Sequence, residues 1–230
     1  MAEPLTIALP KGRILATAAR LLARAGLALE PVLRADDRRL LVELPDGNRV
    51  LLVKPIDVPT YVEHGVADLG VAGADTLEEQ ARDLYEPVDL GIGACRLVVA
   101  EARDRPARPS SRPAGPVRRG MAVRVATKYP RLTRRHYIAK GIEPEIIPLW
   151  GSVELAAVTD LADQIVDLVE SGETLRQNGL TEVETIMRVT SRLIVHPASL
   201  KLGPARIAAV IDAVRAACAP LEPTRTAEAS

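Results

Sequence analysis

Aromatic side chains are scarce in this chain of 230 residues: they make up 2% of it, with one Trp and no Phe. Hydrophobic residues still make up 47% of the chain, so a full core is available and must be built from Leu, Val, Ile and Ala. Proteins that bind single-stranded nucleic acid commonly stack bases on several aromatic side chains. The scarcity of aromatics therefore argues against that class.

The chain has no net charge, because 30 Lys and Arg balance 30 Asp and Glu. Bulk charge therefore indicates neither a nucleic acid nor an anionic membrane as partner. No apolar run approaches the length that spans a bilayer. The N-terminus also lacks the basic segment and long apolar segment of a signal peptide. We therefore expect a cytoplasmic protein that binds no nucleic acid and no membrane.

Cysteine and histidine are also rare. Cys95 and Cys218 form no CxxC pattern, and the three histidines show no ligand spacing. Buried free thiols are predicted rather than a disulfide or a metal site.

Residues 165–175 (IVDLVESGETL) carry the most informative pattern. An apolar strand-like run is followed by the turn Ser171-Gly172 and by a pattern that can start a helix at Thr174. A strand, a tight turn and a helix start are typical of an anion site, because turn amides and hydroxyls point at the ligand. Gly172 allows close backbone approach.

Three acids accompany this turn. Glu170 and Glu173 suit sugar hydroxyls, or a metal ion that accompanies a phosphate, better than the phosphate itself. Asp167 is expected near the strand end, where it can accept hydrogen bonds from ribose hydroxyls. The pattern favours a phosphorylated sugar, but an ordinary strand–turn–helix corner gives the same spacing.

A second glycine turn follows the apolar run 5–9. Lys11, Gly12 and Arg13 lie between this predicted strand and a helix with apolar spacing over 14–25. The turn can bind an anion, or its two cations can simply be solvated.

Short strands and helices alternate along the chain, which predicts an α/β protein with mostly parallel sheets in two lobes. Lobe I is predicted from residues 1–95 and about 180–220, and lobe II from 96–179. Residues 87–100 are predicted as one long extended connection, and Ser152 as the cap of a helix through 158. The Pro- and Arg-rich segment 101–120 is predicted to be a mobile loop, and residues 221–230 a frayed tail.

Six segments, in order, resemble the ATP phosphoribosyltransferases, which catalyse the first step of histidine biosynthesis. They are residues 9–13 (LPKGR), 57–63 (DVPTYVE), 67–70 (ADLG), 124–130 (RVATKYP), 151–156 (GSVELA) and 162–175. The resemblance implies two lobes like those of a type II periplasmic binding protein, with a cleft between them. It also implies the reaction: adenine N1 of ATP attacks the anomeric carbon of 5-phosphoribosyl 1-diphosphate (PRPP), and pyrophosphate leaves, with Mg²⁺ required.

The resemblance also implies the site residues. Catalytic roles fall to Lys11, Arg13 and Asp167. PRPP binding falls to Asp163, Asp167, Glu170, Ser171, Gly172, Glu173 and Thr174. Nucleotide binding falls to Lys11, Gly12, Arg13, Lys54, Asp75, Gly151, Ser152 and Glu154. Metal ligands are not assigned. No general base is evident, so we expect catalysis by positioning and electrostatic stabilisation.

Three positions depart from the family pattern: Lys54-Pro55 stands where Arg-Ala is expected, Ala74 where a polar residue is common, and His196 where Asn is expected. Little sequence follows the helix predicted at 204–217. We therefore expect the short form of the enzyme, which works in a hetero-oligomer with a regulatory subunit similar to histidyl-tRNA synthetase. Two alternatives stay open: a two-lobed binding protein without chemistry, and a phosphoribosyltransferase acting on another base.

Overall fold

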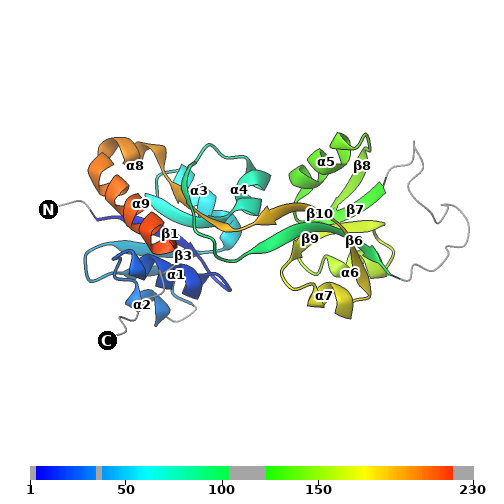
Figure 1. The fold of residues 1–230 in the computed structure, drawn as a ribbon, viewed down its shortest axis with the longest axis horizontal. Helices are drawn as coiled ribbons and strands as arrows, with labels where there is room; N and C mark the ends of the chain where they lie inside the picture. The colour runs from blue at the N-terminus through cyan, green and yellow to red at the C-terminus, as the bar shows by residue number, and fades with distance from the viewer. Residues whose placement is uncertain (1–3, 35–37, 104–122, 220–230) are drawn as a thin grey trace, which may run out of the picture. The chain divides into compact units, whose positions relative to one another are not determined.

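The computed structural model describes residues 4–34, 38–103 and 123–219, which divide into two compact units (Figure 1). Unit 1 consists of the described parts of Met1–Gly73, Arg82–Ile92 and Ser191–Ser230. Unit 2 consists of Ala74–Ala81 and the described part of Gly93–Thr190. Each unit is therefore discontinuous in sequence.

Unit 1 is built on a six-stranded sheet with the order β2-β3-β1-β4-β11-β5. Its central pairs, β1 with β3 and β1 with β4, are parallel, and its other three pairs are antiparallel. The strands are β1 (Thr6–Pro10), β2 (Leu41–Glu43), β3 (Arg49–Val53), β4 (Leu69–Gly73), β5 (Tyr85–Asp89) and β11 (Ser191–Val195).

The core of unit 1 lies between this sheet and the helices α1, α2 and α9. Ile7 and Leu9 of β1 pack there, together with Leu22 of α1 and Ile211 of α9. On β4, a side chain at Gly70 would lie within 3 Å of two valines of α3, so this position needs glycine. The helices and the short 3-10 turn are α1 (Leu15–Arg24), α2 (Glu30–Leu33), η1 (Pro55–Asp57), α3 (Val58–Glu63), α8 (Pro197–Leu202) and α9 (Pro204–Cys218).

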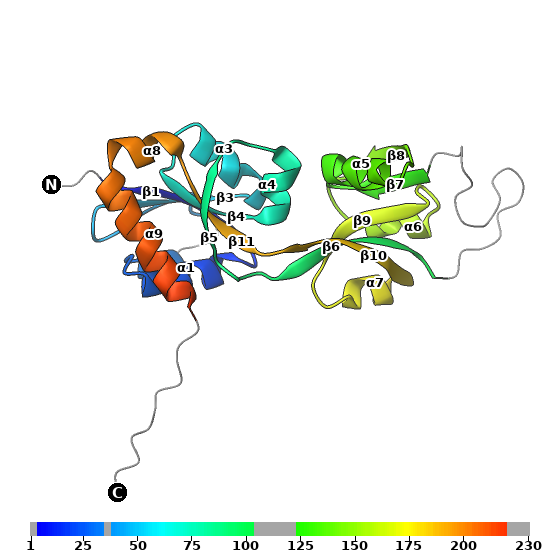
Figure 2. The same ribbon diagram turned by 45° about the horizontal axis from the view of Figure 1, so that its top comes forward.

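Unit 2 is built on a five-stranded sheet with the order β10-β6-β9-β7-β8. The pairs β9 with β7 and β7 with β8 are parallel, whereas β10 with β6 and β6 with β9 are antiparallel. Figure 2 shows β6 and β10 running side by side through this unit. The strands are β6 (Cys95–Ala102), β7 (Val123–Thr127), β8 (Pro144–Pro148), β9 (Gln164–Val169) and β10 (Leu180–Val189).

Helices cover both faces of the unit 2 sheet. On one face, Leu132 of α5 packs with Val125 and Val166. On the other face, Ala156 of α6 and Leu175 of α7 pack with Ala126 and Ile165. These two residues are the sequence neighbours of Val125 and Val166, so their side chains point to the opposite face. This alternation is the one that a sheet buried on both sides requires. The helices are α4 (Ala74–Gln80), α5 (Pro130–Ala139), α6 (Glu154–Val158) and α7 (Glu173–Gln177).

The predicted division at residue 179 is wrong. Strand β10 was expected to return to the first lobe, but it pairs with β6 from Leu180 to Val189 and belongs to unit 2. Only β11 returns to unit 1, where it lies between β4 and β5. Helix α4 was also expected in the first lobe and belongs to unit 2.

The expectation of mostly parallel sheets needs a similar correction. The α/β class is confirmed, but only four of the nine strand pairs are parallel. The antiparallel pairs come from the strands that pass between the units and from the hairpin at 41–53, because neither kind of connection needs a crossover helix.

Residues 87–100 do not form one extended connection, because β5 and β6 are separate strands. Gly91 and Gly93, with φ of 64° and 65°, interrupt the run between them. Neither Cys95 nor Cys218 is joined in a disulfide, and each is half-buried rather than buried. Most of the predicted loop at 101–120 and all of the predicted tail at 221–230 lie outside the described residues.

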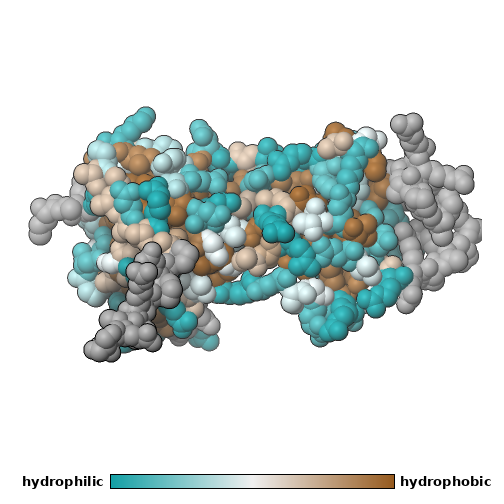
Figure 3. Space-filling model, viewed as in Figure 1, coloured by the Kyte–Doolittle hydropathy of each residue, from teal (hydrophilic) through white to brown (hydrophobic). Residues whose placement is uncertain are grey.

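The surface mixes hydrophilic and hydrophobic residues, as the face in Figure 3 shows. Among the described residues, the two most exposed large apolar side chains are Leu202, at 87%, and Trp150, at 79%. No helix in the described ranges is both long and apolar enough to cross a membrane.

Candidate active site

Three loops of unit 2 meet at one edge of its sheet. Strands β7, β8 and β9 are parallel, so the loops that follow them leave the same edge. Thr127 lies in register with Pro148 on one side and Val166 on the other. In open α/β sheets this carboxyl edge is the usual place for a ligand.

The centre of this edge is an ion pair between Lys128 and Asp167. The Lys128 Nζ atom lies 3.5 Å from Asp167 Oδ2, and the side chains are 35% and 13% exposed. Asp167 Oδ1 also accepts a hydrogen bond of 2.9 Å from the backbone N–H of Leu168. The pair therefore presents a carboxylate and an ammonium group side by side.

Burial raises the pKa of Asp167 above its ordinary value. The positive charge of Lys128 and the Leu168 N–H lower this pKa, while the nearby Glu154 carboxylate raises it further. Desolvation outweighs the ion pair, so the fold disfavours the charged carboxylate that a ligand hydroxyl would bind.

The glycine turn follows β9 as predicted, and α7 begins at Glu173, one residue before the expected start. Gly172 has a φ of 81° and precedes the helix as its cap. A Cβ there would meet nothing closer than 3.8 Å, so the backbone angle rather than space demands glycine. Arg96 fixes the turn from β6 by donating to the Glu170 carbonyl oxygen at 3.0 Å.

The polar groups of this turn are not all equally available. The hydroxyl of Ser171 accepts a bond of 3.3 Å from the Glu173 N–H. The Glu173 carboxylate pairs with Arg176 and accepts a bond of 2.8 Å from the Gln177 side chain. Glu173 thus contacts its own helix, while the side chains of Ser171 and Thr174 are both exposed.

The loop after β8 brings Gly151, Ser152 and Glu154 to the same edge. The prediction that Ser152 caps a helix is wrong, because α6 begins at Glu154 without a side-chain cap and Ser152 adopts a φ of 46°. Left-handed backbone is strained in a residue other than glycine, and such strain gathers at functional sites. Trp150 precedes this loop.

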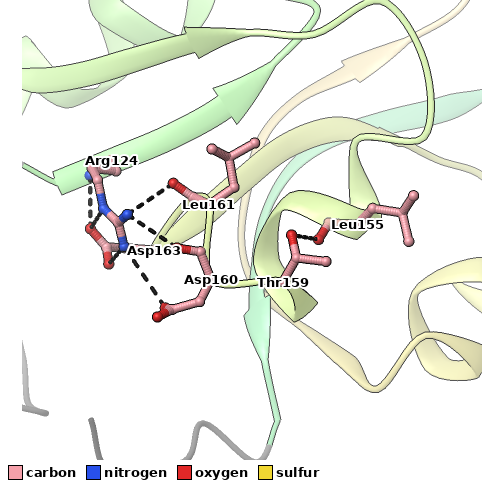
Figure 4. Close-up of polar contacts among 6 residues, drawn as sticks. All are labelled: Arg124, Leu155, Thr159, Asp160, Leu161 and Asp163. Atoms are coloured by element: carbon pink, nitrogen blue, oxygen red, sulfur yellow. Dashed lines mark hydrogen bonds and ion pairs between the residues drawn. The ribbon is translucent and has the colours of Figure 1, made fainter. Parts of the chain in front are cut away.

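Asp163 is not brought to this edge. It precedes β9, whereas the glycine turn follows that strand, so about 20 Å of extended chain separates them. Both of its carboxylate oxygens accept hydrogen bonds from Arg124, at 3.0 Å from Nη2 and 3.3 Å from Nε (Figure 4). Arg124 also donates to the carbonyl oxygens of Asp160 and Leu161. This cluster fastens the loop between α6 and β9 and leaves Asp163 a structural role.

Asp75 also has a structural partner that the sequence analysis did not foresee. It is 6% exposed, and its Oδ2 accepts a bond of 2.9 Å from the Tyr129 hydroxyl. Burial, followed by the Asp75 charge and hydrogen bond, raises the pKa of Tyr129, so the phenol keeps its proton. The structure places Asp75 against α5 rather than in an open nucleotide site.

Sequence reasoning missed Lys128 and its two neighbours as site residues. The fully buried Thr127 accepts a bond of 2.9 Å from the Tyr129 N–H and donates one of 2.8 Å to the Val166 carbonyl oxygen. The signal was available in part, since a lysine directly after a parallel strand belongs at the carboxyl edge. Its pairing with Asp167 required knowing that β7 and β9 are neighbours.

In unit 1, Lys11 follows β1 and Lys54 follows β3, and these two neighbouring strands end in register. Pro10 lies in register with Val53, and the Lys11 N–H donates to the Val53 carbonyl oxygen at 2.8 Å. Gly12, with a φ of 88°, turns the chain before α1 and leaves Arg13 exposed. The carboxyl edge of the unit 1 sheet thus gathers Lys11, Gly12, Arg13 and Lys54, the residues for which nucleotide binding is expected.

No group of three or more His, Cys, Asp or Glu side chains in the described ranges is arranged to hold a metal ion. A resident metal cage is therefore not among the features of this part of the chain.

Comparison with known proteins places the chain in a family. The family model described as "HisG: ATP phosphoribosyltransferase" matches residues 54–216. A curated ATP phosphoribosyltransferase of Syntrophotalea carbinolica is 50% identical over 213 residues, which is 92% of this chain and 94% of that protein. The ATP phosphoribosyltransferase of Sorangium cellulosum is also 50% identical, over 95% of this chain and 98% of that protein.

Solved structures agree. An ATP phosphoribosyl transferase (HisG:HisZ) complex from Thermotoga maritima is similar with a TM-score of 0.75 and 31% identity, over 93% of this chain and 98% of that one. The periplasmic aliphatic sulphonate binding protein SsuA of Escherichia coli shares the fold at a TM-score of 0.56 and 15% identity, over 95% of this chain and 73% of that one. This chain belongs to the ATP phosphoribosyltransferase family.

Proposed function

We propose that this chain transfers the 5-phosphoribosyl group of PRPP to N1 of ATP and releases pyrophosphate, the first step of histidine biosynthesis. Its membership of the family supports this reaction. The observation in the structure that carries the proposal is the arrangement on β9, where a half-buried carboxylate precedes a glycine turn at the carboxyl edge of a sheet.

Two parts of PRPP, its 5-phosphate and its ribose, each have partners in this arrangement. The turn amides and the hydroxyls of Ser171 and Thr174 bind its 5-phosphate, because amides at such a turn favour an anion. The ribose hydroxyls donate to Asp167. Glu170 stands beside the turn as a further acceptor, while Glu173, which contacts Arg176, orders the helix that the turn begins.

The reaction needs positioning and charge stabilisation more than proton transfer. Adenine N1 attacks the anomeric carbon with its own lone pair, so no base has to remove a proton first. Positive charge develops on the sugar as the bond to diphosphate lengthens. The negative charge of Asp167, held where the sugar binds, stabilises that state.

We assign Mg²⁺ to the substrate rather than to a cage in the protein. Mg²⁺ usually keeps several waters and is held by substrate phosphates with one or two carboxylates. The described residues offer no group of three ligands. Mg²⁺ therefore enters on the diphosphate of PRPP or the triphosphate of ATP.

The phosphates of ATP have two sets of partners in this proposal. Lys11, Gly12, Arg13 and Lys54 offer cations and a turn amide at the carboxyl edge of the unit 1 sheet. Gly151, Ser152 and Glu154 offer a turn at the corresponding edge of unit 2. Asp75 is left out, because Tyr129 occupies its carboxylate.

We also propose that the active form is a hetero-oligomer with a regulatory subunit. The Thermotoga maritima structure is a HisG:HisZ complex, and this chain covers 98% of the chain that it matches there. A partner resembling histidyl-tRNA synthetase would carry the response to histidine. A binding protein of the same fold without chemistry is less well supported, because the sulphonate binding protein is only 15% identical.

The experiment that tests the proposal is calorimetric titration of the purified chain with PRPP and Mg²⁺, with ribose 5-phosphate as a second ligand. We expect saturable binding, and we expect Thr174→Val to weaken it by about 10-fold, since one hydrogen bond to a charged group is lost. A folded wild-type chain that binds neither ligand, and shows no ATP-dependent release of pyrophosphate with the partner present, would overturn the proposal.

Two glycines provide a matched control. Gly172 and Gly179 both have positive φ, of 81° and 67°, and an added Cβ would meet no close atom at either. Alanine should therefore destabilise the fold by about 1 kcal/mol at each position. Only Gly172→Ala should also weaken PRPP binding, because only Gly172 shapes the turn.

A further inference from the structure

We propose that Lys128 is a catalytic residue of this reaction: its ammonium group contacts the diphosphate of PRPP and stabilises it as it leaves. We further propose that Thr127 and the Tyr129–Asp75 hydrogen bond act as positioning residues that aim it. The inference rests on the proposed function and adds the residue that faces the leaving group.

Lys128 lies beside Asp167 at the carboxyl edge of β7 and β9. It directly follows β7, and the alternation along that strand places it on the same face of the sheet as Ala126, which packs with Ile165 and Val169. Asp167 lies on that face too, and the two charged groups are 3.5 Å apart. Lys128 is the more exposed of the two, so its ammonium group borders the ligand side.

The structure of the ribose decides whether Lys128 contacts the diphosphate or the 5-phosphate of PRPP. If Asp167 accepts from the ribose hydroxyls, the hydroxyl on carbon 2 is among them, and carbon 2 is bonded to the anomeric carbon that bears the diphosphate. The 5-phosphate lies at the other end of the ring, on the turn after β9. That turn is held from β6 by Arg96, whereas Lys128 follows β7, and β6 and β7 lie on opposite sides of β9. A cation within ion-pair distance of Asp167, on the β7 side, therefore meets the diphosphate.

The backbone around Lys128 is fixed on both sides. Thr127 is fully buried, and its hydroxyl joins the Tyr129 N–H to the Val166 carbonyl oxygen of β9. The Tyr129 hydroxyl donates to Asp75, which is itself buried at 6% exposure. A lysine held between two anchored residues loses less freedom on meeting its ligand, which strengthens its effect on the transition state.

The step balances without a further reactant. The lone pair of adenine N1 forms the bond to the anomeric carbon, and the electron pair of the old carbon–oxygen bond leaves on the diphosphate. The amino group of the alkylated adenine releases one proton to solvent. Lys128 stays protonated and only stabilises the charge that gathers on the departing oxygen.

The test compares two ligands that represent the two ends of PRPP. Pyrophosphate with Mg²⁺ represents the leaving group, and ribose 5-phosphate represents the sugar with its phosphate. In Lys128→Met we expect calorimetry to show pyrophosphate binding weakened by about 10-fold or more and ribose 5-phosphate binding changed by less than about 3-fold. We also expect kcat, measured with the regulatory subunit, to fall by about 100-fold, with a smaller change in KM.

The chain offers a matched control in Lys140, which pairs with Glu184 at the end of α5 in the same unit. Lys140→Met removes an equivalent lysine–carboxylate pair and should leave both affinities and kcat unchanged. Lys128→Gln serves as a second variant if the methionine side chain impairs folding. Positioning is tested by Thr127→Val, which should lower kcat without weakening ribose 5-phosphate binding, and by Thr127→Ser, which keeps the hydroxyl and should restore kcat.

The outcomes separate the two proposals. An active wild-type enzyme in which Lys128→Met and Lys128→Gln bind pyrophosphate normally, or lose both ligands to the same extent, overturns the role of Lys128 and leaves the proposed function standing. A wild-type chain that binds neither ligand and transfers no phosphoribosyl group overturns the proposed function and the role of Lys128 with it.

Discussion

At the scale of single residues, burial makes the fold favour the protonated form of Asp167 over the ionised form. The pKa of this carboxyl is raised by burial, so the folded protein keeps its proton to a higher pH than the unfolded chain does. Stability therefore falls as the pH rises through the window between the ordinary pKa and the raised one, and above that window the ionised group is a net cost. We interpret this cost as the consequence of keeping a carboxylate ready for ribose hydroxyls.

The variant Asp167→Asn separates the effect of Asp167 on stability from its effect on PRPP binding. At neutral pH it should unfold at the same or a higher Tm than the wild type, because the amide carries no charge to desolvate, while its affinity for PRPP falls by about 10- to 100-fold. Thermal unfolding across the acid range and calorimetry measure the two quantities. The stability difference should shrink as the pH falls and wild-type Asp167 becomes protonated. A variant less stable than the wild type at neutral pH would contradict this interpretation.

The sequence indicated the structure that is set locally and missed the contacts that depend on neighbouring strands. The turn at Ser171 and Gly172 was predicted because a turn between a strand and a helix has its own signature. The pairing of Lys128 with Asp167 depends on β7 lying beside β9, whose paired residues are 39 positions away in the sequence. The contact of Asp163 with Arg124 was missed for the same reason, since Arg124 lies on that neighbouring strand.

At the scale of elements, α5 takes its N-terminal cap from another helix. The Glu79 carboxylate of α4 accepts bonds of 2.8 and 2.9 Å from the N–H groups of Arg131 and Leu132. These N–H groups belong to the first turn of α5, where no partner exists within the helix. The cap, together with the Asp75–Tyr129 bond, explains why α4 belongs to unit 2.

Glu79→Ala should lower the free energy of unfolding by about 1 kcal/mol, the usual cost of losing a cap, and chemical denaturation measures this as a lower midpoint. The neighbouring Glu78 is the control. Its carboxylate pairs with Arg135 at the surface, with 45% and 60% of the side chains exposed, so Glu78→Ala should cost less than about 0.5 kcal/mol. Equal losses in both variants would show that the cap contributes nothing beyond a surface charge.

Elements with a clear hydrophobic periodicity in the sequence were predicted well, and elements whose limits depend on tertiary contacts were not. The helix predicted over 204–217 is α9, and the strand predicted over 5–9 is β1. The apolar run 87–100 contains two strands that belong to different units, and hydrophobicity alone does not show where one sheet ends and the other begins. Helices α2 and α8 are four and six residues long, too short for a period to appear.

At the scale of the whole molecule, the proposed dependence on a partner is directly measurable. The purified chain should form phosphoribosyl-ATP slowly, and adding the regulatory subunit of the same organism should raise the rate by about 10- to 100-fold, the range of a typical coupling between sites. Histidine should inhibit only the mixture. Full and histidine-sensitive activity of the chain by itself would show that no partner is needed.

The position of β11 sets the order in which the protein can be completed as it is made. Among the described strands, β11 lies between β4 and β5 and is the only partner of β5, yet it comes last in the sequence. All residues of unit 2 leave the ribosome before β11 does. Unit 2 can therefore complete its sheet first. Until β11 is synthesised, β4 and β5 of unit 1 each keep an unpaired edge.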